Sequence, residues 1–427
     1  MNKPFTHLKA ETTVNVREIV TPAGLRAWLV EDYAVPIVAL EFATRGGGAQ
    51  DPAGKAGLAT MIAGLIDEGA GDLDDQAFQT ALDEKAIELS FHAERDHLSG
   101  RMRTLSRNLD RAGELMQLAI NAPRFDEGPF LRVREQMNAR LRHEAHEPAH
   151  MAGAAWRAGV FAGHPYSQAT EGELDTLAAI ELADVRSHGR ELITRAKIVI
   201  AVVGAIGPDR AATLIDQLFA GLPDKANHID IEPAPFHGLG KREIIDLDVP
   251  QSTIRFGRPA LSRKDPEYMA SVVLAHVLGG GTGLSSRLFR EVREKRGLAY
   301  SVSASVATFE HAAYLYGGTT TKNERAYESL EVIQGEILDL AHGNVTEAEL
   351  DKGRKYLIGS YPLRFDTSTK IASQLVHIQL DGFGVEWLSE RNRLIAAVSM
   401  ADAKRVAERL FGDGALSVTM VGRPVAG

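Results

Sequence analysis

The 427-residue sequence contains no cysteine. This absence excludes disulfide bridges, metal sites built on thiolates and a cysteine nucleophile. It leaves the cellular compartment open, because a cysteine-free chain is compatible with oxidising and reducing environments alike.

Long apolar runs are missing as well. No stretch approaches the roughly 20 consecutive apolar residues that a membrane-spanning helix needs. The N-terminal residues MNKPFTHLKAETTVNV hold no apolar core of a signal peptide. We therefore expect no membrane partner for the chain as given. The same N-terminus is also expected of a mature chain from which an export signal has been removed.

An excess of positive charge is the third feature that the sequence lacks. Lysine and arginine number 48 against 57 aspartate and glutamate, which gives a formal net charge of −9. Such a chain has no general attraction for phosphate backbones, so we expect no nucleic-acid partner. With 44% hydrophobic and 25% charged residues, the composition is that of an ordinary globular protein, and the length favours two or three domains.

Two halves of the sequence repeat one pattern. Markers in the first half recur 214 residues later in the same order, and later markers recur after 218 residues. The earlier pairs are Val35-Pro36 with Val249-Pro250, Phe42 with Phe256, and Asp51-Pro52 with Asp265-Pro266; the later pairs are LAAIELAD ending at Asp184 with IAAVSMAD ending at Asp402, and Gly204 with Gly422. Shared order and spacing favour an internal duplication with a short insertion.

Strand-like and helix-like patterns alternate in both halves. The β-branched runs 37–42 and 198–203 indicate buried strands. Apolar residues at three- and four-residue spacing across 109–119 indicate an amphipathic helix. The sequence thus predicts an α+β fold of two homologous domains, each a mixed β-sheet with helices packed on it. We expect the domains at 1–222 and 241–427, with a proline-rich linker at 223–240.

Several motifs resemble those of the insulinase (pitrilysin) superfamily of metallopeptidases. Residues 284–302 (LSSRLFREVREKRGLAYSV), which follow the glycine run 279–281, are similar to the signature of the second domain in that family. HPY at 164–166 and VTEAELDKGRKYLIGS at 345–360 are further matches. The resemblance covers nearly the whole chain. Within the superfamily, the chain resembles bacterial subunits that are similar to those of mitochondrial processing peptidase.

The zinc motif of the superfamily is missing. Metal-bearing members carry HxxEH in the first domain, whereas this chain has GLATMIAGLIDEGAG at 57–71, with Thr60, Ala63 and Gly64 at the three functional positions. The third ligand position falls near Arg140. Zinc needs imidazole or carboxylate donors and its general base needs a carboxylate, so we expect this chain to bind no metal and no other cofactor.

A second pair of residues keeps the pattern of the family. Arg293 and Tyr300 match an arginine and a tyrosine that members place seven residues apart. The resemblance implies that Arg293 holds a peptide carbonyl or carboxylate and that Tyr300 stabilises an oxyanion. We expect Gly297 to end the helix that carries Arg293, and Tyr300 to begin the next strand; their convergence is left to the tertiary structure.

Other interpretations of these residues stay open. Without the resemblance, Arg293 fits a solvated helix face and Tyr300 a half-buried strand residue. A rival metal site is His146, Glu147 and His150 within HEAHEPAH, which partly matches HExxH. Pro148 disfavours the regular helix that would align both imidazoles, so a polar loop is the simpler interpretation.

The resemblance implies the non-metal subunit of a heterodimeric zinc metallopeptidase. A homologous HxxEH-containing partner would supply the zinc, and this chain would contribute Arg293 and Tyr300 to peptide hydrolysis while being inactive alone. The alternatives are a catalytically silent scaffold, as in the core proteins of respiratory complexes, and an independent metal enzyme using His146, Glu147 and His150. Bacterial relatives favour a periplasmic location, with the cytoplasm as the alternative.

Overall fold

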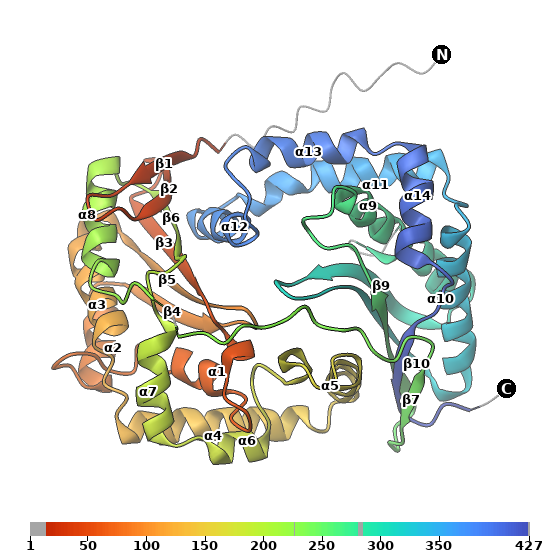
Figure 1. The fold of residues 1–427 in the computed structure, drawn as a ribbon, viewed down its shortest axis with the longest axis horizontal. Helices are drawn as coiled ribbons and strands as arrows, with labels where there is room; N and C mark the ends of the chain where they lie inside the picture. Colours follow the sequence, from red (N-terminus) through yellow and green to blue (C-terminus); the bar gives the residue numbers. More distant parts are fainter. Residues whose placement is uncertain (1–13, 226, 281–284, 426–427) are drawn as a thin grey trace.

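The computed structural model describes residues 14–225, 227–280 and 285–425, which form two β-sheets with helices around them (Figure 1). The first sheet has the order β1-β2-β6-β3-β5-β4 and the second the order β7-β11-β8-β10-β9. The strands are β1 (Arg17–Val20), β2 (Arg26–Glu31), β3 (Ile37–Arg45), β4 (Glu88–Ala93), β5 (His97–Leu105), β6 (Val199–Gly204), β7 (Arg242–Ile245), β8 (Gln251–Pro259), β9 (Ala299–Thr308), β10 (Ala313–Lys322) and β11 (Ser417–Val421).

Helices surround the two sheets. In the first half they are α1 (Leu58–Ala63), α2 (Asp75–Asp83), α3 (Leu109–Asn121), α4 (Glu127–Glu144), α5 (Pro148–Val160), α6 (Leu174–Ala179), α7 (Leu182–Leu192) and α8 (Pro208–Phe219). In the second half they are α9 (Tyr268–Gly279), the π-helix η4 (Phe289–Lys295), α10 (Ala326–Ala341), α11 (Glu347–Gly359), the 3-10 turn η6 (Tyr361–Arg364), α12 (Ser368–Leu380), α13 (Trp387–Ala397) and α14 (Met400–Phe411). Figure 1 shows α3 and α8 beyond the first sheet, and α10 and α14 beyond the second.

The local predictions from the sequence are confirmed. The runs 37–42 and 198–203 lie in β3 and β6, whose interiors are buried because helices cover both faces of the sheet. The apolar positions of 109–119 form the buried side of α3, which ends before Pro123. Residues 281–284, which include part of the glycine run and the first residue of the signature, lie outside the described residues.

Strand pairing repeats between the two sheets and confirms the duplicated α+β fold. Strands β2 and β6 pair in parallel, as do β7 and β11, whereas the remaining equivalent pairs are antiparallel. Strands β3 and β8 begin at Ile37 and Gln251, which are 214 residues apart. Residues 223–240 contain no helix or strand where they are described. The exact domain bounds stay a prediction, because packing crosses between the halves.

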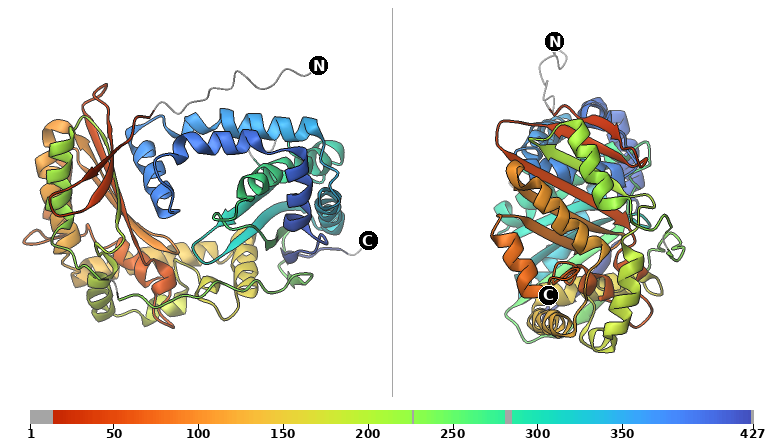
Figure 2. Two further views of the ribbon diagram at one scale, coloured as in Figure 1. Left: turned by 45° about the horizontal axis from the view of Figure 1, so that its top comes forward. Right: turned by 90° about the vertical axis from the view of Figure 1, so that its left-hand side faces the viewer.

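One helix from each half packs on the inner face of the sheet formed by the opposite half. Helix α12 packs on β3 and β6 of the first sheet, and α5 packs on β8 and β11 of the second. These helices hold equivalent places in the repeat, and Figure 2 shows α12 beside the first sheet in the turned view on its left. The exchange interlocks the halves through two apolar clusters, one around α12 and one around α5.

The tips of two equivalent hairpins meet at the centre of the molecule. The backbone N–H of Glu310, at the β9–β10 turn, donates to Asp96 Oδ2 over 2.9 Å at the β4–β5 turn. Tyr166 of the HPY motif donates to Asp96 Oδ1 over 2.6 Å and accepts from the N–H of His311 over 3.0 Å. Arg45 also pairs with Glu310. The HPY motif therefore joins the two halves.

Replacing Trp156 tests the exchanged helix α5. Its indole is buried, donates to Ser417 O over 3.1 Å, and lies so close to Gly257 that an added Cβ there would be 2.4 Å from Trp156 Cζ2. We expect Trp156→Ala to lower the free energy of unfolding by about 3–5 kcal/mol in urea titrations followed by circular dichroism. The control Val20→Ala, at a side chain that is 65% exposed, should change it by less than about 0.5 kcal/mol. A loss of under about 1 kcal/mol for Trp156→Ala would contradict a packing contribution from the exchange.

Candidate functional site

The structure brings Arg293 and Tyr300 together. Arg293 lies in η4, Gly297 has a φ of +57°, and the N–H of Gly297 donates to Arg293 O over 3.0 Å. This left-handed turn, which glycine adopts readily, reverses the chain so that Tyr300 is the second residue of β9. The guanidinium carbon of Arg293 lies 4.5 Å from the ring centre of Tyr300 and 4.8 Å from that of Phe289. Arg293 thus contacts two aromatic rings.

A β-bulge exposes Tyr300. Val302 pairs with Thr319 and Ala299 with Thr321, so Tyr300 and Ser301 together oppose a single residue of β10. Alternation of burial breaks at this point, since Ala299 and Val302 are buried and both residues between them are exposed. The side chain of Tyr300 is 81% exposed. Its hydroxyl is consequently available to a ligand or to another chain.

The charged run around Arg293 is organised by the buried Glu291. Lys295, Arg296 and Arg290 all pair with this carboxylate, at 2.7, 2.7 and 3.3 Å. Burial alone would raise the pKa of Glu291, but the hydrogen bonds from the three cations outweigh it and bring the pKa to about 2. These ion pairs hold η4 in place and give each of the other three cations of the run a carboxylate partner.

Arg293 itself stays outside that network. Within the described part of the chain, no carboxylate lies in ion-pair range of its guanidinium and no acceptor takes its donors. Contacts with the faces of Phe289 and Tyr300 hold the guanidinium in place without engaging its N–H donors. Each such cation–π contact contributes about 0.5–1 kcal/mol of stabilisation at an exposed site. The five N–H donors therefore remain free for a carbonyl or carboxylate.

The three positions of the missing zinc motif lie at α1 but offer no metal ligand. Thr60 uses its hydroxyl to donate to Thr170 O over 2.6 Å, Ala63 is buried, and Gly64 ends the helix. Arg140, near the third ligand position, is an exposed residue 4.0 Å from Glu144. Hydroxyl, methyl and hydrogen side chains do not fit a zinc ion, and the arginine near the third position offers no ligand either.

The rival metal site is not assembled. Helix α4 ends at Glu144 and α5 begins at Pro148, so His146 and Glu147 lie in the junction while His150 lies on the second helix. All three are exposed, and His150 Nε2 instead faces Glu144 at 3.5 Å. Across residues 14–225, 227–280 and 285–425, no group of three or more histidine, aspartate or glutamate side chains is placed to hold a metal. The HExxH interpretation is wrong.

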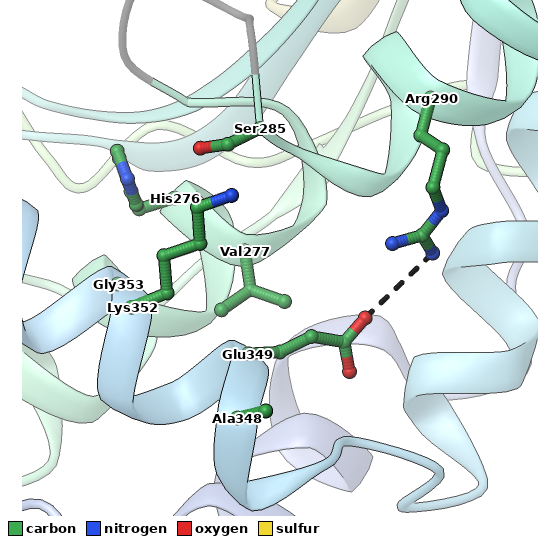
Figure 3. Close-up of a pocket in the computed structure, with 8 residues that line it drawn as sticks. All are labelled: His276, Val277, Ser285, Arg290, Ala348, Glu349, Lys352 and Gly353. Atoms are coloured by element: carbon green, nitrogen blue, oxygen red, sulfur yellow. Dashed lines mark ion pairs between the residues drawn. The ribbon is translucent and has the colours of Figure 1, made fainter.

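A hollow of about 500 Å³ lies next to η4, between α9 and α11 (Figure 3). Arg290 and Glu349 face each other at 3.8 Å, and His276 and Lys352 approach from the two helices. Arg290 also binds Glu291, so its charge is already neutralised. Ser285 and His276 both line the hollow, but no hydrogen bond joins them among the described residues, and we assign the hollow no chemistry.

Sequence reasoning missed three contributors to the site: Phe289, Glu291 and the bulge at Tyr300. Phe289 precedes Arg293 by four residues, a spacing that brings side chains together on a helix and could have revealed the stacking. The burial of Glu291 and the bulge depend on contacts with distant strands, so no local pattern indicates them.

Comparison with known proteins confirms the resemblance to the insulinase superfamily. Residues 179–357, which include Arg293 and Tyr300, match the family described as "Peptidase M16 inactive domain". A Helicobacter pylori protein named non-peptidase homolog YmxG is 26% identical over 340 residues, covering 79% of this chain and 78% of its own. An uncharacterized zinc protease of Mycobacterium leprae is 24% identical and covers 94% of this chain and 91% of its own.

A solved structure shows the same fold. The crystal structure of a peptidase M16 inactive domain from Pseudomonas fluorescens superimposes with a TM-score of 0.90 at 23% identity, covering 97% of this chain and 99% of the other. At this identity the likeness shows a shared fold. No helix in the described ranges is long and apolar enough to cross a membrane.

The Glu291 network generates a prediction about pH. Because the folded pKa of about 2 lies below the ordinary value of 4.5, its stabilisation is complete above about pH 4.5 and declines as the pH falls toward 2. We expect Glu291→Gln to lower the free energy of unfolding by about 1–3 kcal/mol at pH 7. The difference from the parent should shrink between pH 5 and pH 3 in urea titrations. Glu294→Gln, at an exposed carboxylate of the same turn, is the control, and a difference that does not vary with pH would refute the network.

Proposed function

We propose that this chain is the non-metal subunit of a heteromeric zinc metallopeptidase. A homologous HxxEH-containing subunit would hold the zinc, and this chain would supply Arg293 and Tyr300 to the shared centre. One observation supports the proposal above the others. The zinc-motif positions hold no metal ligand, yet the guanidinium of Arg293, which has no carboxylate partner among the described residues, lies beside the exposed phenol of Tyr300.

The chemistry of the two side chains suits peptide hydrolysis. Zinc on the partner supplies the activated water. The planar guanidinium of Arg293 offers forked N–H donors that can hold the carbonyl or a carboxylate of a peptide. The Tyr300 hydroxyl can donate to the oxygen that becomes negative when the peptide carbonyl is attacked. Neither step requires a metal on this chain.

The setting of the pair favours a contribution in trans. An exposed arginine costs little to leave unpaired in water, but its interaction with a peptide strengthens when a second subunit covers it and excludes solvent. The 81% exposure of Tyr300 leaves room for that covering surface. The Glu291 network fixes the backbone of η4 while the Arg293 donors remain free.

A catalytically silent scaffold is the second candidate. The name of the Helicobacter pylori relative, non-peptidase homolog, favours it for that protein. An exposed tyrosine with a stacked arginine is also common at protein interfaces, where both residue types are enriched. The two candidates differ in whether the pair affects turnover or only assembly. Periplasmic location, with the cytoplasm as the alternative, stays a prediction from the resemblance.

Reconstitution with the copurifying HxxEH-containing protein tests the proposal. We expect the isolated chain to contain no stoichiometric zinc by elemental mass spectrometry and to cleave no fluorogenic peptide, whereas the mixture should be active. Arg293→Ala and Tyr300→Phe should each lower kcat of the mixture by about 10²-fold, since each removes one transition-state donor.

Matched controls separate catalysis from assembly. Arg393→Ala and Tyr33→Phe remove an arginine that is 67% exposed and a tyrosine that is 62% exposed, both elsewhere on the surface, and should leave kcat unchanged. Unchanged kcat for the Arg293 and Tyr300 variants in a fully assembled complex would favour the scaffold. Peptide cleavage by the isolated chain would refute a divided centre.

A further inference from the structure

A second, larger cavity opens between α12 and the second sheet. Its volume is about 1200 Å³ including the mouth, and its walls come from α9, β9, η6, α12 and α13. Figure 1 shows α12 facing α9 and β9, with α13 along the top of the view. The cavity reaches β9 at Ala304, four residues from Tyr300 and so roughly 13 Å along the strand. It is separate from the Arg293 and Tyr300 pair.

Two arginines in this cavity have no counterion within the part of the chain that the structure describes. Arg391 donates to Leu357 O over 3.3 Å and to Asn392 Oδ1 over 2.9 Å, and its guanidinium carbon lies 4.1 Å from the ring centre of Tyr361. Arg364, also in the lining, has no hydrogen bond or ion pair from its side chain to any described residue. Burial, with the nearby charge of Arg364, lowers the pKa of Arg391 to about 10.

Two buried arginines of the second half, Arg287 and Arg354, are neutralised by carboxylates. Arg287 pairs with Asp339 at 2.6 Å and Glu349 at 2.8 Å, and Arg354 pairs with Glu347 at 2.9 Å. In the cavity itself, Arg263 pairs with Asp381. Arg364 and Arg391 face the same hollow without a carboxylate partner among the described residues, and like charges in this position repel each other unless an anion lies between them.

The rest of the lining indicates the class of ligand. Tyr268 and Tyr361 are buried around the arginines, and Trp387 stacks on Phe383 with 3.8 Å between ring centres. Without the open mouth the cavity offers about 400 Å³, which lies within the roughly 300–1,000 Å³ of sites that bind small organic ligands and exceeds what an inorganic anion requires. Forked donors beside aromatic walls suit a carboxylate on an apolar carrier.

We propose that this cavity binds a short peptide through a carboxylate held by Arg364 and Arg391. The carboxylate can belong to an acidic side chain or to the peptide C-terminus, since both present the same two oxygens to the arginines. Aromatic side chains of the lining contact apolar residues next to that carboxylate. The site belongs to this chain alone, so it does not depend on a zinc-bearing partner.

Calorimetric titration of the full chain with three matched peptides tests the proposal. Acetyl-Phe-Glu-Phe-amide carries a side-chain carboxylate, acetyl-Phe-Gln-Phe with a free C-terminus carries a terminal one, and acetyl-Phe-Gln-Phe-amide carries none. We expect at least one acidic peptide to bind about tenfold or more tightly than the neutral one. The stronger of the two acidic peptides identifies the source of the carboxylate.

Variants connect the affinity to the two arginines. Arg364→Met and Arg391→Met should each weaken binding of the acidic peptide about tenfold or more, and Arg393→Met, on the exposed side of α13, should not. Arg364 is exposed at the cavity mouth, so its variant keeps the test valid if Arg391→Met fails to fold. Equal binding of all three peptides, unchanged affinity in Arg364→Met, or inorganic phosphate that binds as tightly as the acidic peptides would overturn the proposal.

Discussion

The stacking of the Arg293 guanidinium between Phe289 and Tyr300 is the interaction on which the functional account depends. Aromatic faces hold a cation in position while leaving its hydrogen bonds unused, which a carboxylate partner would not do. Glu291 makes this possible, because it takes up the other three cations of the run and leaves Arg293 outside. A guanidinium with unused donors is thus held in a helix whose other cations all pair with Glu291.

The duplicated fold places the degenerate zinc-motif positions and the Arg293–Tyr300 pair in different halves. The two sheets share their pairing pattern. The exchanged helices α5 and α12 hold the two halves together through contacts that do not involve the zinc-motif positions of α1. Loss of the zinc ligands at Thr60, Ala63 and Gly64 therefore leaves the fold of the second half intact. The same exchange encloses the cavity with the unpaired Arg364 and Arg391, since α12 forms one of its walls.

Features carried by local patterns were predictable from the sequence, and features that arise from contacts between distant segments were not. The strands β3 and β6, helix α3 and the turn at Gly297 follow from periodicity and glycine chemistry. The exchange of α5 and α12, the bulge that exposes Tyr300 and the burial of Glu291 each depend on strands far away in the sequence. The convergence of Arg293 and Tyr300 lies between these cases, since seven residues separate them but the turn geometry decides whether they meet.

Site-specific photocrosslinking tests the central claim most directly. A photoreactive benzoylphenylalanine in place of Tyr300 would lie where the divided centre needs its phenol, in the assembled complex with the HxxEH-containing subunit and a labelled peptide. The account predicts a crosslink between this position and the peptide that depends on the partner. Crosslinks confined to this chain, in a complex that cleaves the peptide, would contradict it.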